Sequence, residues 1–129
     1  MRKLPQKLSS KINELKRSMY IVVSGLNDYK KAREAIRMAE YQAGDGKNLA
    51  VMLQGDGINW IKESKEKRVN EIQTSIGVIH ELGCPIFLCG ASLNEEGLSP
   101  TMGDYKFNIS SAPRRISQVV EKGWQLAVF

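Results

Sequence analysis

Three short runs of apolar, often β-branched residues constrain this chain most, because helix-like patterns separate them and the first two end in small-residue turns. The runs are MYIVVSG (19–25), KNLAVMLQGDG (47–57) and CPIFLC (84–89). Unbroken apolar runs of this length are typical of strands that are buried on both faces. Strands that alternate with helices predict a mostly parallel sheet with helices on both sides. The expected fold is therefore α/β, with three layers α/β/α and a five-stranded sheet.

The two remaining strands are expected at 105–110, where YKFNIS alternates and is less buried, and at 124–129. Apolar spacing and cap residues predict the helices. Three of them cover residues 28–44, 67–82 and 112–123. Asn27 or Asp28 caps the first, and Pro113 lies in the first turn of the last. A further short helix is expected to begin at the capping box formed by Ser92 and Glu95 and to end near Gly97. Residues 58–64 are expected to form a short helix or loop around Trp60, and SPTMGD (99–104) a loop.

The net charge of +5 is concentrated at the N-terminus. Residues 1–17 contain six Lys and Arg residues against Glu14 alone, while the remainder is balanced. We therefore divide the chain into a basic N-terminal extension (1–17), expected to be helical, and a single α/β domain (18–129). A nucleic-acid contact would belong to the extension, but a solvated arm is the simpler expectation, so nucleic acid is not an expected partner.

The compartment is expected to be the cytoplasm. No apolar run is long enough to span a membrane, and no apolar segment of a secretory signal follows the basic start. The two cysteines do not form a disulfide scaffold. If residues 85–89 are extended, the Cα atoms of Cys84 and Cys89 lie about 16 Å apart, too far for a disulfide. Two free thiols suit a reducing compartment.

Candidate site residues gather where the strands end. In an open α/β sheet, ligands bind beyond the carboxyl ends of the strands. The turns there are SGLN (24–27), QGDG (54–57) and CGAS (89–92), whose small residues allow close approach to the backbone. The expected rim of this site comprises Asn27, Asp56, Gly57, Gly90 and Ser92.

Cys89 has two interpretations that the residues alone leave open. Its sulfur stands just before a helix, whose N-terminal amides favour the thiolate, which is the nucleophilic form. A buried, inert cysteine is equally consistent with the position. Cys84 precedes Pro85 at the other end of the strand and is interpreted as structural.

Other chemistries find little support in the sequence. No Cys, His and Asp cluster has metal-ligand spacing, so no metal is expected, and no cofactor either. No dinucleotide fingerprint, phosphate-binding loop or nucleophile elbow is present. His80 falls near a helix C-terminus and is expected on the surface. Trp60 and Tyr29 are interpreted mainly as packing residues, with a pocket as the alternative.

The order of four segments resembles the DsrE/DsrF-like family of small sulfur-relay proteins, from about Met19 to Phe129. The segments are SGLNDYKKAREAIRMAE, VMLQGDGI, IFLCGASLNEEGL and VVEKGWQLAVF. In the third, Cys89 ends the strand and Gly97 follows eight residues later, as in the family. The resemblance implies a three-layer α/β/α fold and a homotrimer or homohexamer.

The resemblance also implies a function. Cys89 would accept sulfane sulfur as a persulfide from one sulfur-relay protein and pass it to another, without a cofactor. Whether the protein is an enzyme in the strict sense is left undecided. The alternative is a non-catalytic binding or interaction module of the same fold, with its ligand or partner at the rim.

Two features depart from the family pattern. Glu95 and Glu96 stand where relatives carry arginines, and carboxylates close to Cys89 would raise its pKa. They would otherwise serve as cap and surface residues. Ser92 stands where some relatives carry a second cysteine, so no resolving thiol is adjacent.

Overall fold

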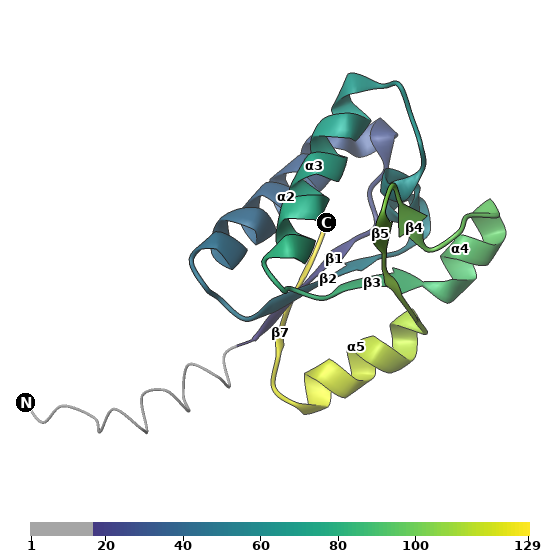
Figure 1. Cartoon of the computed structure of the whole chain (residues 1–129). Coiled ribbons are helices and arrows are strands. Elements are labelled where there is room, and N and C mark those ends of the chain that lie inside the picture. The colour runs from purple at the N-terminus through teal and green to yellow at the C-terminus, as the bar shows by residue number, and fades with distance from the viewer. Residues whose placement is uncertain (1–16) are drawn as a thin grey trace, which may run out of the picture.

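The protein folds around one five-stranded parallel sheet (Figure 1). The computed structural model describes residues 17–129, so the N-terminal extension lies outside the described residues apart from Arg17. The strands lie in the order β6-β3-β2-β1-β7, and each neighbouring pair is parallel. Their bounds are β1 Ser18–Val22, β2 Leu49–Leu53, β3 Ile86–Cys89, β6 Asn108–Ser110 and β7 Gln125–Val128.

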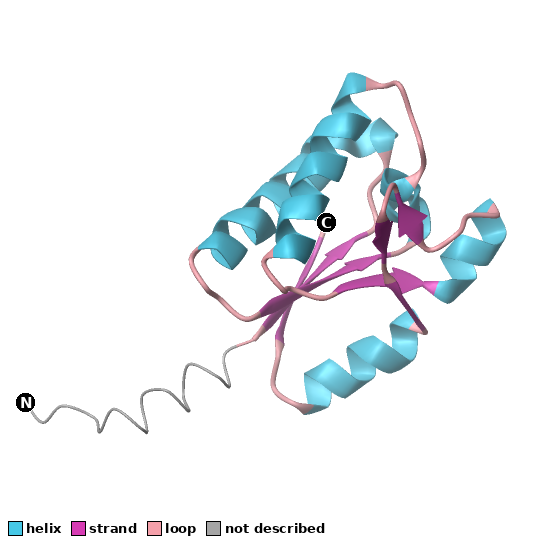
Figure 2. Ribbon diagram, viewed as in Figure 1, coloured by secondary structure: helices cyan, strands magenta, loops and turns pink. Residues whose placement is uncertain are grey.

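Helices cover both faces of this sheet, which confirms the predicted three-layer α/β/α fold (Figure 2). The helices α2 (Tyr29–Gly44) and α3 (Lys67–Glu81) pack on the first face, and α5 (Ala112–Glu121) packs on the second. The short helix α4 (Gly90–Glu96) continues directly from the end of β3.

The apolar strands are explained by this two-sided burial. In β1, Tyr20 and Val22 pack with α2 and α3, while Met19 and Ile21 pack with α5. All five residues of β2 are buried for the same reason. A central parallel strand needs apolar side chains on both sides, so its sequence is apolar throughout instead of alternating.

The second face is only partly covered. Leu126 and Val128 of β7 pair in register with Met19 and Ile21, so their side chains point to the same face as α5. Val128 is 64% exposed, and Val120 on α5 is 51% exposed. Apolar side chains of one edge strand and one helix therefore remain uncovered in the single chain.

Short 3₁₀ helices follow the first two strands. These are η1 (Leu26–Asp28) after β1 and η2 (Gly55–Ile61) after β2. Trp60 in η2 is buried, and its indole N–H donates a 2.7 Å hydrogen bond to the carbonyl oxygen of Ser24. Trp60 is therefore packed in the core, and its hydrogen bond ties the turn after β2 to the turn after β1.

Gly57 holds the same two turns together. A Cβ at this position would overlap the carbonyl oxygen of Val22, so a side chain does not fit without moving the backbone. Gly57 is buried in η2 and lies against the end of β1. The glycine is thus explained by close backbone packing.

The prediction of one strand over 105–110 is wrong in detail. Tyr105–Lys106 (β5) instead pairs antiparallel with Thr101–Met102 (β4), within the segment expected to be a loop. Gly103 makes the turn between them, with φ of 59°. Phe107 is buried after β5, and its N–H donates to the carbonyl of Pro100, so the chain leaves the hairpin before β6 joins the sheet.

His80 is less exposed than the sequence suggested. It is half-buried, and its ring makes edge-on contacts with Tyr105 and Phe107, with centroids 5.2 and 5.3 Å away. The hairpin therefore covers the C-terminal part of α3. None of the helices in residues 17–129 combines the length and apolar character needed to cross a membrane.

Candidate functional site

The turns after β1, β2 and β3 lie side by side because the three strands are parallel neighbours. Val22 pairs with Leu53, and Leu53 pairs with Leu88, one residue before Cys89. The carboxyl ends of these strands therefore form one rim, where α/β sheets bind ligands.

Cys89 occupies the junction between a strand and a helix. It is the last residue of β3, with extended backbone angles (φ −63°, ψ 117°), and it stands at the N-cap position of α4. Its side chain points to the second face of the sheet, where it packs with Met52 and Ala112. The side chain is 7% exposed, so the sulfur lies just beneath the surface of the rim.

The prediction that Ser92 caps α4 is wrong. The helix begins at Gly90, so Ser92 is its third residue and Glu95 lies inside the last turn. The extended backbone of Cys89 runs straight into the helix, which moves the start three residues earlier than the capping-box pattern suggested. Gly97 does end the helix as expected, in the left-handed conformation with φ of 64°.

The hydroxyl of Ser92 instead forms a hydrogen bond with a neighbouring turn. It accepts a 2.8 Å hydrogen bond from the backbone N–H of Gly55, at the start of η2. A hydroxyl can accept and donate at the same time, so Ser92 still has a hydrogen to donate. That hydroxyl is a hydrogen-bond partner of the Cys89 sulfur, so Gly55, Ser92 and Cys89 form one chain.

The surroundings of Cys89 favour its thiolate. Burial raises the pKa of this thiol, but the hydroxyl of Ser92 and the backbone groups of Ser92, Ala91 and Ala112 outweigh that effect. The net result is a pKa below the ordinary value of a cysteine. Ala112 opens α5, so hydrogen-bond partners from two helix starts face this sulfur.

Cys84 has the opposite environment at the other end of the same segment. Its side chain is buried, and this burial raises the pKa of its thiol, although a backbone contact with Leu49 lowers it slightly. Both cysteines are free thiols. A buried sulfur whose neutral form is favoured agrees with a structural role for Cys84.

Glu95 and Glu96 are exposed near the end of α4. Among the described residues, the groups that shift the pKa of Cys89 are its burial, Ser92, Ala91 and Ala112, and the two carboxylates are not among them. The structure therefore favours the interpretation of Glu95 and Glu96 as surface residues.

Sequence reasoning missed two residues beside Cys89. Ser110, on β6, is the register partner of Cys89 and is also buried. Its hydroxyl accepts a 3.0 Å hydrogen bond from Nε of Arg115, whose guanidinium lies 4.5 Å from the ring centre of Phe87. The segment SSAPRR (110–115) directly after a strand was the available signal, but β6 had to be placed beside β3 before it gained meaning.

The remaining rim residues are not equally accessible. Asn27 and Asp56 are exposed in η1 and η2. Gly90 is half-buried, and a Cβ there would lie 3.2 Å from the side chain of Ile109. Gly57 is buried against Val22. It therefore allows the turn after β2 to pack closely, but it is not exposed at the rim.

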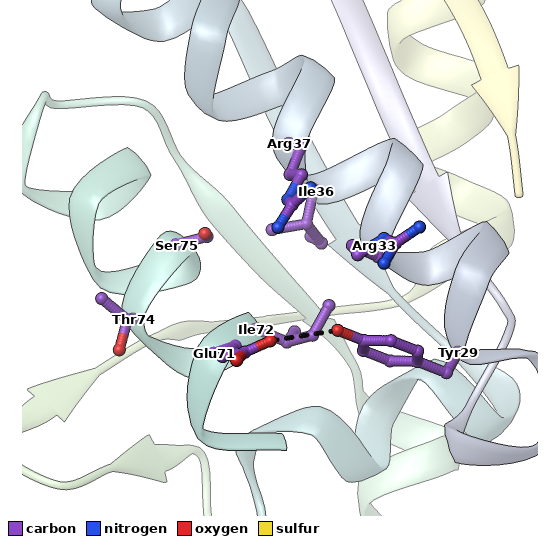
Figure 3. A pocket seen from close by; sticks show the side chains of 8 residues that line it. All are labelled: Tyr29, Arg33, Ile36, Arg37, Glu71, Ile72, Thr74 and Ser75. Atoms are coloured by element: carbon purple, nitrogen blue, oxygen red, sulfur yellow. Dashed lines mark hydrogen bonds between the residues drawn. The ribbon is translucent and has the colours of Figure 1, made fainter. Parts of the chain in front are cut away.

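A cavity of about 230 Å³ lies away from Cys89, in the groove between α2 and α3 (Figure 3). Ile36 and Ile72 contribute apolar side chains to its lining. Tyr29 lines it as well, and its hydroxyl donates a 3.1 Å hydrogen bond to Glu71. Tyr29 therefore lines a cavity, which was the alternative to a packing role for this residue.

A second cavity, of about 260 Å³, lies beside the turns after β1 and β2. Leu26, Trp60 and Val69 give it an apolar lining. Within residues 17–129, no three His, Cys, Asp or Glu side chains are grouped so as to hold a metal ion.

Comparison with known proteins places this chain in a family. The family model described as "DsrE/DsrF-like family" matches residues 16–128. The chain belongs to the DsrE/DsrF-like family. The family model covers nearly the whole described domain, including all five strands of the parallel sheet.

Two solved structures share the fold of this DsrE/DsrF-like chain. The ychN protein from E. coli superposes with a TM-score of 0.71 at 14% identity, over 88% of this chain and 99% of its own. A conserved protein of unknown function from Bacteroides thetaiotaomicron, BT1422, gives 0.68 at 13% identity, over 87% and 94%. No curated protein matches the sequence.

Proposed function

We propose that this protein carries sulfane sulfur as a persulfide on Cys89. The observation that supports the proposal most is the placement of this sulfur among the Ser92 hydroxyl and the backbone groups of Ala91, Ser92 and Ala112. These partners stabilise a thiolate at the rim of the sheet. Membership of the DsrE/DsrF-like family supports a role in sulfur relay.

The reaction needs no electron donor or acceptor beyond the sulfur compounds themselves. The Cys89 thiolate attacks the sulfane sulfur of a donor, so a new S–S bond forms as the donor's S–S bond breaks and the donor departs with the electron pair. A thiolate of the acceptor then attacks the outer sulfur, and Cys89 leaves as the thiolate. Other sulfur-relay proteins are the proposed donor and acceptor.

Mass spectrometry tests this proposal directly. The full-length protein is incubated with inorganic polysulfide, and the sulfur gained is localised by peptide mapping. We expect one added sulfur atom on Cys89 in the wild type and in Cys84→Ser, and none in Cys89→Ser. Sulfur that persists in Cys89→Ser, or a wild type that gains none, would refute the proposal.

A non-catalytic binding module is the second candidate. It is supported by the low exposure of Cys89 and by the apolar cavity beside Leu26 and Trp60 at the same rim. In this case Cys89 of the native protein alkylates no faster than in a denatured control. A rate that clearly exceeds the denatured control would argue against this second candidate.

We also propose that the protein assembles as a homotrimer or homohexamer. The uncovered apolar side chains of Val120, Leu126 and Val128 support a contact on the second face. Native mass spectrometry of the wild type and Val128→Asp tests this. A monomeric wild type, or an assembly that Val128→Asp leaves intact, would count against this contact.

A further inference from the structure

Arg115 is held in a defined position next to the cysteine site. Its Nε donates a 3.0 Å hydrogen bond to the hydroxyl of Ser110, and its guanidinium carbon lies 4.5 Å from the centre of the Phe87 ring. Arg115 is half-buried and is the fourth residue of α5. Two different strands therefore anchor this one cation.

Both anchoring residues are neighbours of Cys89. Ser110 is the register partner of Cys89 on the adjacent strand. Phe87 lies two positions before Cys89 on β3, so both side chains point to the second face, about 7 Å apart along the strand. The two residues that hold the guanidinium are therefore direct neighbours of Cys89, one on the adjacent strand and one on β3 itself.

The two acids on α4 stand at the far end of that helix from Cys89. Glu95 and Glu96 are the last two residues of α4, so they stand about 9 Å along the helix axis from Cys89. Both are exposed, so solvent screens their charges. The charge that is held against the neighbours of Cys89 is therefore positive.

We propose that Arg115 makes Cys89 selective for small anionic sulfane-sulfur donors, of the class in which a sulfonate group adjoins the sulfane sulfur. This inference rests on the proposed function. The Cys89 thiolate attacks the sulfane sulfur of such a donor, the bond between that sulfur and the sulfonate breaks, and sulfite leaves with the electron pair. Arg115 attracts the incoming anion and stabilises the negative charge of the departing sulfite.

Alkylation with two reagents measures this selectivity without any sulfur transfer. Iodoacetate is an anion, and iodoacetamide is its neutral counterpart. Both react with the same thiolate, so the ratio of their rates at Cys89 cancels any change in the pKa of the thiol. Because two unit charges several ångströms apart attract each other only weakly in water, we expect Arg115→Gln to lower the ratio about threefold. Salt at 1 M should remove the difference.

Arg114 provides the matched control. It is exposed, adjacent in sequence and identical in charge, so Arg114→Gln changes the net charge equally. This variant should keep the wild-type ratio, and Arg115→Lys should keep most of it. Ser110→Ala preserves the charge but frees the guanidinium, so an intermediate ratio is expected. If Arg115→Gln does not fold, Arg115→Lys and Ser110→Ala still test the inference.

Sulfur loading from inorganic thiosulfate gives the second measurement. This donor carries two negative charges, so we expect loading to slow about tenfold in Arg115→Gln. Equal alkylation ratios in Arg115→Gln and Arg114→Gln would overturn the inference, whatever the loading shows. A ratio that depends on Arg115, together with no loading from any donor, would refute persulfide transfer and leave the anion selectivity standing. A Cys89 that neither reagent modifies would overturn both.

Discussion

The backbone N–H of Gly55 donates a 2.8 Å hydrogen bond to the hydroxyl oxygen of Ser92. This contact joins the turn after β2 to the first turn of α4, across 37 residues of sequence. The same hydroxyl is a hydrogen-bond partner of the Cys89 sulfur, since it can accept from Gly55 and donate its own hydrogen at once. The state of the cysteine thus depends on how two neighbouring strands end.

Removing the hydroxyl should weaken the thiolate. In Ser92→Ala we expect the pKa of Cys89 to rise, since the thiolate loses a hydrogen bond that stabilises its charge. The pH dependence of iodoacetamide alkylation at Cys89 measures the pKa, with Cys84 in the same sample as the reference. An unchanged profile would show that Ser92 does not act on the sulfur.

The pH dependence of the free energy of unfolding should reflect the two cysteines in opposite ways. Burial raises the pKa of Cys84 in the folded state. The contribution of this thiol to the free energy of unfolding is therefore complete below the pKa of an unfolded thiol, about 8.5, and is lost as the pH rises through the folded pKa. Cys84→Ala should therefore lose less stability than the wild type as the pH rises above about 8.5. Urea unfolding at several pH values measures this.

Cys89 supplies the matched comparison. Burial alone would raise its pKa, but Ser92 and the neighbouring backbone groups bring it below the ordinary value. Its contribution is therefore present above the unfolded pKa and is lost as pH falls through the folded value. Cys89→Ala should therefore lack the rise in stability that this thiol gives the wild type as the pH approaches about 8.5 from below. If both variants differ from the wild type over the same pH range, the environments of the two sulfurs are not opposed.

Gly57→Ala should be strongly destabilising. The new Cβ would overlap the carbonyl oxygen of Val22, and relief requires the turn after β2 to move away from β1. We expect a loss of about 3 kcal/mol in the free energy of unfolding, measured by urea denaturation. Gly44→Ala is the control, because nothing lies within 4 Å of its added Cβ, and it should change stability by less than about 1 kcal/mol. Equal effects at both positions would contradict the packing argument.

Trp60→Phe should cost about 2–3 kcal/mol. The change removes the 2.7 Å hydrogen bond to Ser24 and leaves a void where a fully buried indole stood. Trp124, which is half-buried with a guanidinium 5.8 Å from its ring centre, serves for comparison. Trp124→Phe should cost less than about 1 kcal/mol. Thermal unfolding of both variants tests the contrast, and a reversed order would show that Trp60 is not a core anchor.

Much of the architecture could be predicted from the sequence because local patterns control it. The apolar runs that became β1, β2 and β3 are buried on both faces, and such strands read as continuous apolar segments. The periodic helices α2, α3 and α5 followed from the spacing of their apolar residues. The position of Cys89 at a strand end followed in the same way.

The details that decide the chemistry are contacts between distant segments, and spacing along the chain does not encode them. The capping-box pattern at Ser92 and Glu95 was misleading, because the hydroxyl of Ser92 is taken by the N–H of Gly55 on the neighbouring turn. The strand predicted at 105–110 broke because Phe107 is buried where the chain leaves a hairpin.

The sequence by itself determined a three-layer α/β fold with a cysteine at the carboxyl end of a central strand, since periodicity and turn residues act locally. Only the tertiary structure decided what surrounds that cysteine. The pairing of β6 with β3 brings Ser110, Ala112 and Arg115 to its side. Hydrogen bonds and charges act through a few ångströms of space, so their effect on the sulfur depended on which strands became neighbours.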